Sequence, residues 1–175
     1  MEIKNTTKFS KEGYFTLNKT LTSKTFLACI GFEVALAALL VFIIIKDNDI
    51  VKPIFLGVLM LLYPFTLYLI MKFQMNRNYN LNKAAYEDMV YDYVFTDEQL
   101  NVRLTHQQKT SEGHITYRAM YKVIETEHFL FVFISSNQAY IIEKANFSSK
   151  KEFDRVILKI KEENVKYKYS KVKDK

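Results

Sequence analysis

A few side chains in this sequence are of types that could perform chemistry, and their spacing decides what that chemistry would be. Asp97 and Glu98 are adjacent carboxyl groups, as general acid–base catalysis uses, but neighbouring side chains on a short turn point apart. His106 and His114 flank one polar segment and could approach each other around a metal ion. Because no third ligand stands at metal-binding spacing, neither pair predicts a catalytic or metal site.

The rest of the composition also argues against catalysis. Ser135 and Ser136 lack the flanking glycines of a nucleophile elbow. Cys29 is the only cysteine, which precludes an internal disulfide and a two-cysteine metal knuckle. A phosphate-binding loop needs two or three glycines within a short segment, and the four glycines are scattered: Gly13, Gly31, Gly57 and Gly113. We therefore predict a non-enzymatic protein with no cofactor and no metal.

Glu33 is the remaining candidate, and it is the only ionisable residue in the apolar segment 25–45. A charged carboxyl group in mid-membrane costs about 2.5 to 3.5 kcal/mol, so we expect it to be neutral or paired. If an antiparallel helix follows, Tyr63 lies at the same depth, and Pro64 beside it frees the carbonyl of Met60. We predict that Glu33 bonds to one of these groups and holds the helices together. The alternative is that Glu33 carries a proton or binds a substrate on a translocation path.

The mean hydropathy of −0.09 hides two apolar segments. Residues 25–45 would span roughly 30 Å as a helix, which matches the hydrocarbon core of a bilayer, and residues 54–71 carry no charge. Two core helices of a soluble domain are the alternative, but the remaining chain is too small to cover helices that are apolar on every face. We predict a transmembrane helical hairpin over residues 25–71, with an outer loop at 46–53.

Basic residues are distributed unevenly around this hairpin. The connecting loop has Lys46 and Lys52, which Asp47 and Asp49 offset. Many more precede the first span or follow the second: Lys4, Lys8, Lys11, Lys19, Lys24, Lys72, Arg77 and Lys83. Because cytoplasmic flanks carry the excess of lysine and arginine, we predict a multi-pass protein of the cell membrane with both termini in the cytoplasm. The net charge of +6 also favours an anionic surface nearby.

A linker at residues 72–88 leads into a region whose apolar residues recur with a period of two. Short antiparallel strands are predicted at 89–95, 100–105, 114–117, 120–125, 129–134 and 138–143. The polar residues 106–113 are predicted to form a loop. The N-terminal segment, residues 1–24, is predicted to be cytoplasmic, with a helix and an edge strand at 2–9 whose place in the sheet is left open.

A final helix is predicted after the last strand. Ser149 and Glu152 form a capping box, and apolar residues follow at helical spacing: Phe153, Val156, Ile157 and Ile160. This helix packs one face on the sheet and completes an α+β domain over residues 89–164. The predicted fold class is therefore a membrane α-helical hairpin joined to an α+β domain.

Residues 165–175 are predicted to form a basic tail. Its lysines are Lys166, Lys168, Lys171, Lys173 and Lys175. One interpretation is a solvated terminus. The other is attraction to anionic lipid head groups, worth about 1 kcal/mol per basic residue near the surface. Nucleic acid is not predicted as a partner, because the domain is tethered to a membrane.

Residues 117–153 read YRAMYKVIETEHFLFVFISSNQAYIIEKANFSSKKEF, with an aromatic strand, a polar turn and an acidic helix start. This segment resembles the YcxB-like family of bacterial membrane proteins, and the layout of two spans followed by a C-terminal domain is similar to that family. The resemblance implies a pleckstrin-homology-like (PH-like) fold, a bent antiparallel sheet or partial barrel capped by one C-terminal helix. Glu143 departs from the family pattern, which more often has proline there. The resemblance implies no ligand and no reaction.

Two functions of different classes follow. The favoured one is a membrane-anchored PH-like binding or scaffold protein at the cytoplasmic face, whose partner is an anionic lipid, another protein or a second copy. The alternative is a small regulatory or accessory subunit of a membrane transport or export system, with Glu33 as its intramembrane functional group. An enzyme acting on membrane substrates is disfavoured because no catalytic constellation is present.

Overall fold

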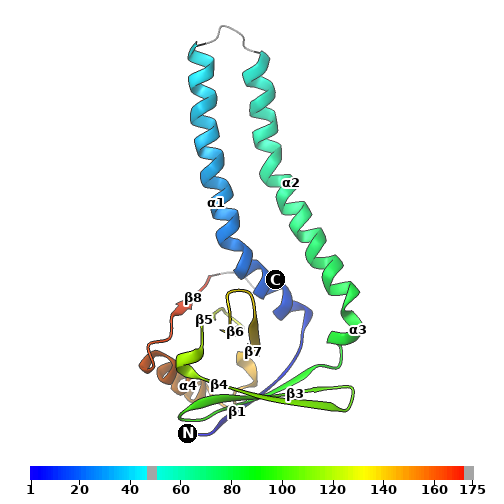
Figure 1. Ribbon diagram of the computed structural model, residues 1–175, viewed down its shortest axis with the longest axis vertical. Helices are drawn as coiled ribbons and strands as arrows, with labels where there is room; N and C mark the ends of the chain where they lie inside the picture. Colours follow the sequence, from blue (N-terminus) through cyan, green and yellow to red (C-terminus); the bar gives the residue numbers. More distant parts are fainter. Residues whose placement is uncertain (47–50, 172–175) are drawn as a thin grey trace. The chain divides into compact units, whose positions relative to one another are not determined.

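The computed structural model describes residues 1–46 and 51–171, which divide into two compact units (Figure 1). The folded unit comprises Met1–Thr20 together with Leu81–Lys175, and the apolar unit comprises Leu21–Asn80. The N-terminal segment therefore shares one unit with the C-terminal domain.

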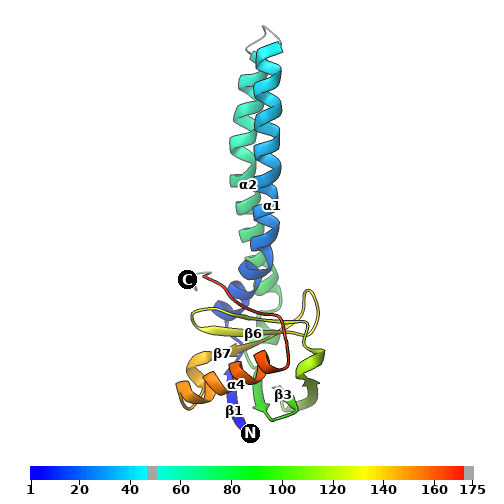
Figure 2. The ribbon, with the colours of Figure 1, turned by 90° about the vertical axis from the view of Figure 1, so that its left-hand side faces the viewer.

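Two long helices that run in opposite directions build the apolar unit, α1 (Lys11–Lys46) and α2 (Val51–Leu81) (Figures 1 and 2). A segment of α1, Lys11–Phe42, is long and apolar enough to cross a membrane, and its most apolar part is not buried. This finding is compatible with a membrane location. The second predicted span, 54–71, is helical within α2 but stays a prediction as a span. Residues 47–50 of the predicted outer loop lie outside the described residues.

The folded unit contains two four-stranded sheets, of which sheet A is antiparallel with the strand order β1-β2-β3-β4. Its strands are β1 (Ile3–Lys8), β2 (Val90–Phe95), β3 (Gln99–His106) and β4 (Lys109–Thr116). The open question about the N-terminal segment is thereby answered, because β1 pairs with β2 along its whole length. Alternate residues of β1 are buried, namely Ile3, Asn5 and Thr7.

Sheet B has the strand order β7-β6-β5-β8. Its strands are β5 (Lys122–Glu125), β6 (Phe129–Phe133), β7 (Ala139–Glu143) and β8 (Tyr167–Tyr169). The last of these pairs in parallel with β5, with Val123 opposite Tyr167. Three residues of the predicted tail therefore form an edge strand, in which Lys168 and Tyr169 stay exposed.

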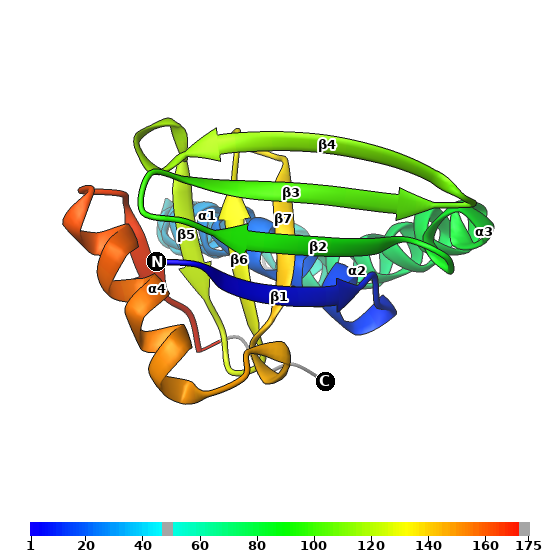
Figure 3. The ribbon, with the colours of Figure 1, turned by 90° about the horizontal axis from the view of Figure 1, so that it is seen from below.

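Helix α4 (Lys150–Glu162) packs its apolar face on the two sheets, as its periodicity predicts. Ser149 caps the helix, since its hydroxyl oxygen accepts a hydrogen bond from the backbone N–H of Glu152 at 3.3 Å. The strands of sheet A run across those of sheet B, and α4 lies along one side of both (Figure 3). The core between them is formed by buried side chains from both sheets and the helix: Ile3, Tyr93, Phe95, Leu100, Val102, Val123, Leu130, Val132, Ile142, Phe153, Val156 and Ile160.

Strand β6 is buried on both faces, which explains its unbroken apolar sequence. Leu130 and Val132 point into the core. Its three phenylalanines, Phe129, Phe131 and Phe133, are buried on the other face. The first turns of α1 cover that face at Gly13, where an added Cβ would lie 2.9 Å from Ile141 Cγ2 and 3.3 Å from Phe129 Cε1. The layers of the folded unit are therefore the start of α1, sheet B, the core and sheet A.

The predicted loop over residues 106–113 is wrong. Strands β3 and β4 continue through it as a hairpin, joined by a two-residue turn in which Gln107 has φ 46° and Gln108 has φ 65°. Two positive φ values define the type I′ turn that matches strand twist, although glycine or asparagine normally occupies it. The alternation of apolar and polar residues is lost here because β4 is exposed on both faces for most of its length.

Candidate functional site

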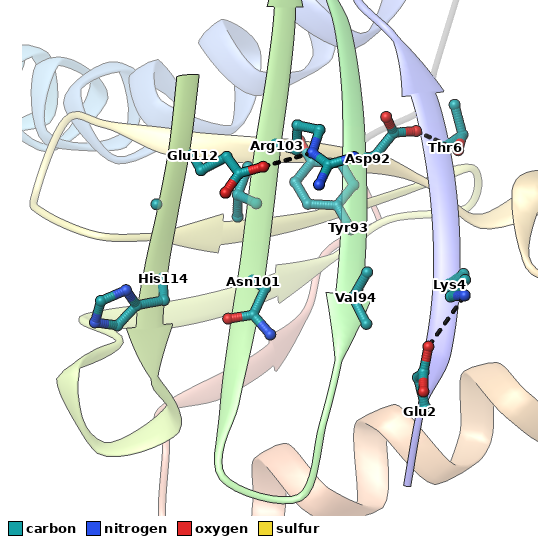
Figure 4. Close-up of a pocket in the computed structure, with 12 residues that line it drawn as sticks. Glu2, Lys4, Thr6, Asp92, Tyr93, Val94, Asn101, Arg103, Glu112 and His114 are labelled. Carbon is teal, nitrogen blue, oxygen red and sulfur yellow. Dashed lines mark hydrogen bonds and ion pairs between the residues drawn. The ribbon is translucent and has the colours of Figure 1, made fainter. Parts of the chain in front are cut away.

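The outer face of sheet A, opposite the core, carries a hollow of about 570 Å³ to which all four strands contribute (Figure 4). Strand register places its side chains in two rows across the sheet. The first row is Thr6, Asp92, Arg103 and Glu112, and the second is Lys4, Val94, Asn101 and His114. We call this surface the sheet A hollow.

The first row alternates in charge. Arg103 is opposite Asp92 on one side and Glu112 on the other, and its Nε lies 2.8 Å from Glu112 Oε1. Asp92 Oδ1 accepts a hydrogen bond of 2.6 Å from the hydroxyl of Thr6. Directly opposed pairs of this kind contribute roughly 0.2 to 1 kcal/mol each, so the row holds the four strands in register.

The second row is more weakly charged. Lys4 Nζ lies 3.0 Å from Glu2 Oε1, and Asn101 Oδ1 accepts a hydrogen bond of 2.8 Å from the side-chain amide of Gln99. With three carboxylates (Glu2, Asp92, Glu112) against two cations (Lys4, Arg103), the hollow is close to charge-balanced at neutral pH. It therefore presents both cationic donors and anionic acceptors, and it lacks the excess of positive charge that an anion-binding site needs.

A second hollow of about 580 Å³ lies beside α4, above a buried charge cluster. The carboxylate of Glu125 accepts hydrogen bonds from Lys144 Nζ at 2.5 Å and from the hydroxyl of Tyr167. Lys144 Nζ also donates to the carbonyl oxygen of Thr126 at 3.1 Å. Burial and the adjacent Glu125 carboxylate raise the pKa of Tyr167. Because these contacts join β5, β8 and the segment after β7, the cluster is structural.

The part of the chain from β3 to α4 supplies Arg103 and Glu112 of the charged row and the helix that closes the core. Residues 95–160 match the model of the YcxB-like protein family. The resemblance that the sequence shows is thereby confirmed for this region. No curated protein and no solved structure matches the chain.

The folded unit also contains an aromatic cluster that sequence reasoning missed, between the start of α1 and the segment before β2. The rings of Phe9 and Tyr86 stack with centroids 4.5 Å apart, and Tyr14 lies 5.9 Å from Tyr86. The backbone N–H of Phe9 donates to the carbonyl of Met89 at 2.9 Å. Residues that precede the apolar segment are thus held against residues that follow it. Helix α2 runs on to Leu81 through the predicted linker.

The predicted pair of Glu33 and Tyr63 lies in the apolar unit. Glu33 Oε1 is shielded from solvent and has no hydrogen-bond partner within the described part of the chain. The side chain of Tyr63 is 46% exposed. The bond between them stays a prediction.

The lysines of the predicted lipid-binding tail lie on either side of β8. Lys166, Lys168 and Lys171 are exposed, whereas Lys173 and Lys175 lie outside the described residues. Tyr167 anchors this segment through Glu125, and the backbone N–H of Ser170 donates to the carbonyl of Glu125 at 2.7 Å. Binding of the tail to anionic lipid stays a prediction.

The histidine pair considered as a metal site is not brought together. Register places His106 opposite Lys109 and His114 opposite Asn101, so the two side chains emerge from opposite faces of sheet A. In the described ranges, 1–46 and 51–171, no group of three potential metal ligands comes together. Asp97 instead binds the N-terminal ammonium group, which lowers the pKa of its carboxyl group.

The residues of the sheet A hollow were not singled out from the sequence. Asp92 and Arg103 occupy polar positions in predicted strands, so their outward direction follows from the period of two. Their alignment with Glu112 does not follow, because that residue falls in the segment predicted as a loop. A two-residue hairpin turn at Gln107 and Gln108 is the signal that would have given the register.

Proposed function

We propose that this chain is a membrane-anchored, non-enzymatic PH-like binding protein that presents the sheet A hollow to a polar protein segment in the cytoplasm. The crossed sheets and C-terminal helix support the PH-like architecture that the family resemblance implies. The apolar segment of α1 supports membrane attachment.

The observation that carries the proposal is the order of layers in the folded unit. The first turns of α1 cover sheet B at Gly13, and the hollow lies on the far face of sheet A. The hollow is thus on the face of the folded unit opposite to the first turns of α1. Its charged side chains are exposed, with Arg103 at 60% and Glu112 at 65%, so a soluble partner can reach them.

The chemistry of the hollow favours a polypeptide over a lipid head group. Anionic lipids bind clusters of lysine and arginine, whereas here Arg103 is flanked by Asp92 and Glu112. Donors and acceptors that alternate along a row suit the amide groups and mixed charges of a protein segment. The exposed, partnered charges of the hollow are groups for binding, and we expect no chemical step there.

The test is cross-linking and affinity capture with the full chain in native membranes. Asp92→Ala with Arg103→Ala removes one charge of each sign from the hollow. The matched control, Asp154→Ala with Arg155→Ala, does the same on the exposed side of α4. We expect a partner that wild type and control capture and the hollow variant loses. Equal capture by all three proteins would exclude the hollow as the binding site.

A second candidate function rests on Glu33. Its Oε1 is a shielded acceptor with no partner among the residues described, as expected if a donor on another subunit completes it. The chain would then be an accessory subunit of a transport or export system. Glu33→Gln should reduce a proton-coupled flux while leaving the stability of the apolar unit unchanged. A loss of stability with unchanged flux would identify Glu33 as structural.

A further inference from the structure

The outer edge of β4 is an unpaired strand edge eight residues long. At the opposite edge of sheet A the side-chain amide of Asn146 donates to the carbonyl of Thr6, in β1, at 2.8 Å. Strand β4 is outermost in sheet A, with no strand beyond it (Figure 3). Exposed edges are templates for pairing with another strand.

Register fixes which backbone groups of β4 are available. The two-residue turn makes His106 and Lys109 a hydrogen-bonded pair, so alternate residues of β4 bond to β3 and the residues between them point outward. The outward backbone groups belong to Thr110, Glu112, His114 and Thr116. Outside the bonds within helices and strands, no described residue makes a backbone hydrogen bond to Thr110, Glu112 or His114.

A second copy of β4 can pair antiparallel with this edge only in registers that oppose two outward residues. A register centred on Glu112 places that residue opposite its own copy, and one centred on His114 does the same for the histidine. A register centred on Gly113 places Glu112 opposite His114 of the other copy, twice. Like charges directly opposite each other destabilise a sheet, which disfavours the first register. In the third register an imidazole N–H of each His114 can donate a hydrogen bond to the Glu112 carboxylate opposite it, so this register is favoured.

We propose that two copies of this protein pair through their β4 strands, antiparallel and centred on Gly113, to form one continuous eight-stranded sheet. The inference goes beyond the proposed function, because it names a second copy of the chain as the partner of the β4 edge, which borders the sheet A hollow at Glu112 and His114.

Gly113 is consistent with this role. An added Cβ at this position would have no atom within 4 Å, and its φ is not positive, so neither packing nor backbone geometry within one copy calls for glycine. Glycine inside a strand often marks close approach of another backbone. In the proposed register the two Gly113 residues form the non-hydrogen-bonded pair at the symmetry axis, where Cα atoms are about 4.5 Å apart.

The symmetry of such a pair places equivalent surfaces of the two folded units on the same side. Opposed residues of an antiparallel pair point to the same face, so the two-fold axis is perpendicular to the sheet. The start of α1 in both copies then lies on one side of the joined sheet, and both hollows lie on the other.

Single cysteines in the full chain, with Cys29→Ser as background, test the register. Gly113→Cys, Glu112→Cys and His114→Cys are oxidised in membranes and separated on non-reducing gels. A disulfide needs Cα atoms about 4.4 to 6.8 Å apart, whereas diagonal positions two residues out of register are about 7 to 8 Å apart. We therefore expect Gly113→Cys to form several-fold more dimer than either neighbour.

Glu127→Cys, on an exposed turn after β5, is the control for random collision. Dimer at position 113 no greater than at position 127 would overturn the proposal, and so would a maximum at position 112 or 114.

A second measurement uses Glu112→Pro, which removes an N–H that points away from β3. This variant should be a monomer in detergent where the wild-type protein is a dimer, and its circular dichroism spectrum should be unchanged. If the wild-type protein is a monomer in detergent and Gly113→Cys forms no cross-link in membranes, the pairing of β4 strands is also excluded. Partner capture through Asp92 and Arg103 is scored separately, so either proposal can fail alone.

Discussion

The side-chain amide of Asn5 donates a hydrogen bond of 2.9 Å to the backbone carbonyl of Glu143 and so ties the first strand of sheet A to the end of sheet B. Thr7 makes the companion contacts, because its hydroxyl accepts from the backbone N–H of Glu143 at 3.0 Å and donates to Asn5 Oδ1 at 2.7 Å. These polar side chains are buried because they satisfy backbone groups where the two sheets meet.

Asn5→Ala should therefore destabilise the folded unit by about 1 to 3 kcal/mol, since it leaves buried polar groups of Thr7 and Glu143 without partners. Urea unfolding followed by circular dichroism measures the loss. Lys4→Ala, on the exposed face of the same strand, should change stability much less. Equal effects of the two substitutions would show that the contact between the sheets contributes nothing.

Gly13→Leu should destabilise the packing of α1 on sheet B by about 1 to 3 kcal/mol, because the new side chain meets Ile141 and Phe129 at overpacked distance. Gly31→Leu is the matched control in the same helix, where an added Cβ has no atom within 4 Å. Thermal unfolding of the full chain in detergent should show a lowered midpoint for the first variant alone. A stable Gly13→Leu protein would mean that α1 does not cover this face.

The β3–β4 turn should gain stability from residues that tolerate positive φ. Left-handed backbone costs a residue with a side chain about 1 to 2 kcal/mol, and both Gln107 and Gln108 adopt it. Gln107→Asn with Gln108→Gly should raise the unfolding midpoint without changing the circular dichroism spectrum. Gln99→Asn, at the other end of β3, should give no gain. A lowered midpoint for the turn variant would argue against a type I′ turn.

Much of this fold follows from sequence period. The aromatic strand at 129–134 and the capped helix after Ser149 are strongly patterned because each buries a defined face. The N-terminal strand and β8 were harder to predict, since Asn5, Thr7 and Tyr167 are polar groups whose burial depends on partners far away in the chain. The positions of these two strands in the sheets depend on contacts with sheet B, which the sequence pattern does not show.

The candidate site was harder to predict from the sequence for a related reason. A surface row such as Asp92, Arg103 and Glu112 depends on register, and register depends on the turn. Glutamine is an uncommon choice for a tight hairpin, so the polar segment was predicted to be a loop. The aromatic contact between Tyr14 and Tyr86 joins residues on either side of the apolar segment. No local sequence pattern predicts this contact.

Stability of the folded unit should fall at alkaline pH through Tyr117. Burial, together with the carboxylates of Asp97 and Glu163, raises the pKa of Tyr117 to about 12. In the unfolded chain the phenol releases its proton near pH 10, so its stabilising contribution is complete below about pH 10 and is lost as the pH rises towards about 12. Urea midpoints at about pH 8 and about pH 11 measure the fall, and Tyr117→Phe should reduce it. A fall of the same size in that variant would assign the effect to other groups, such as buried Tyr93, whose pKa is also raised.

Tyr167→Phe should release β8 from the edge of sheet B. The hydroxyl of Tyr167 donates to Glu125, which is 9% exposed, and its removal leaves that carboxylate with Lys144 alone. The loss of a hydrogen bond to a charged, buried group should cost about 1.5 to 3 kcal/mol and should speed amide hydrogen exchange across β5 and β8. Tyr169→Phe is the matched control, because that side chain lies on the same face of β8 but is 51% exposed, and the side-chain donors to Glu125 are Lys144 and Tyr167. If both variants exchange at the wild-type rate, the Glu125 cluster does not hold the strand, and the exposed lysines beside β8 are then free to move with the tail.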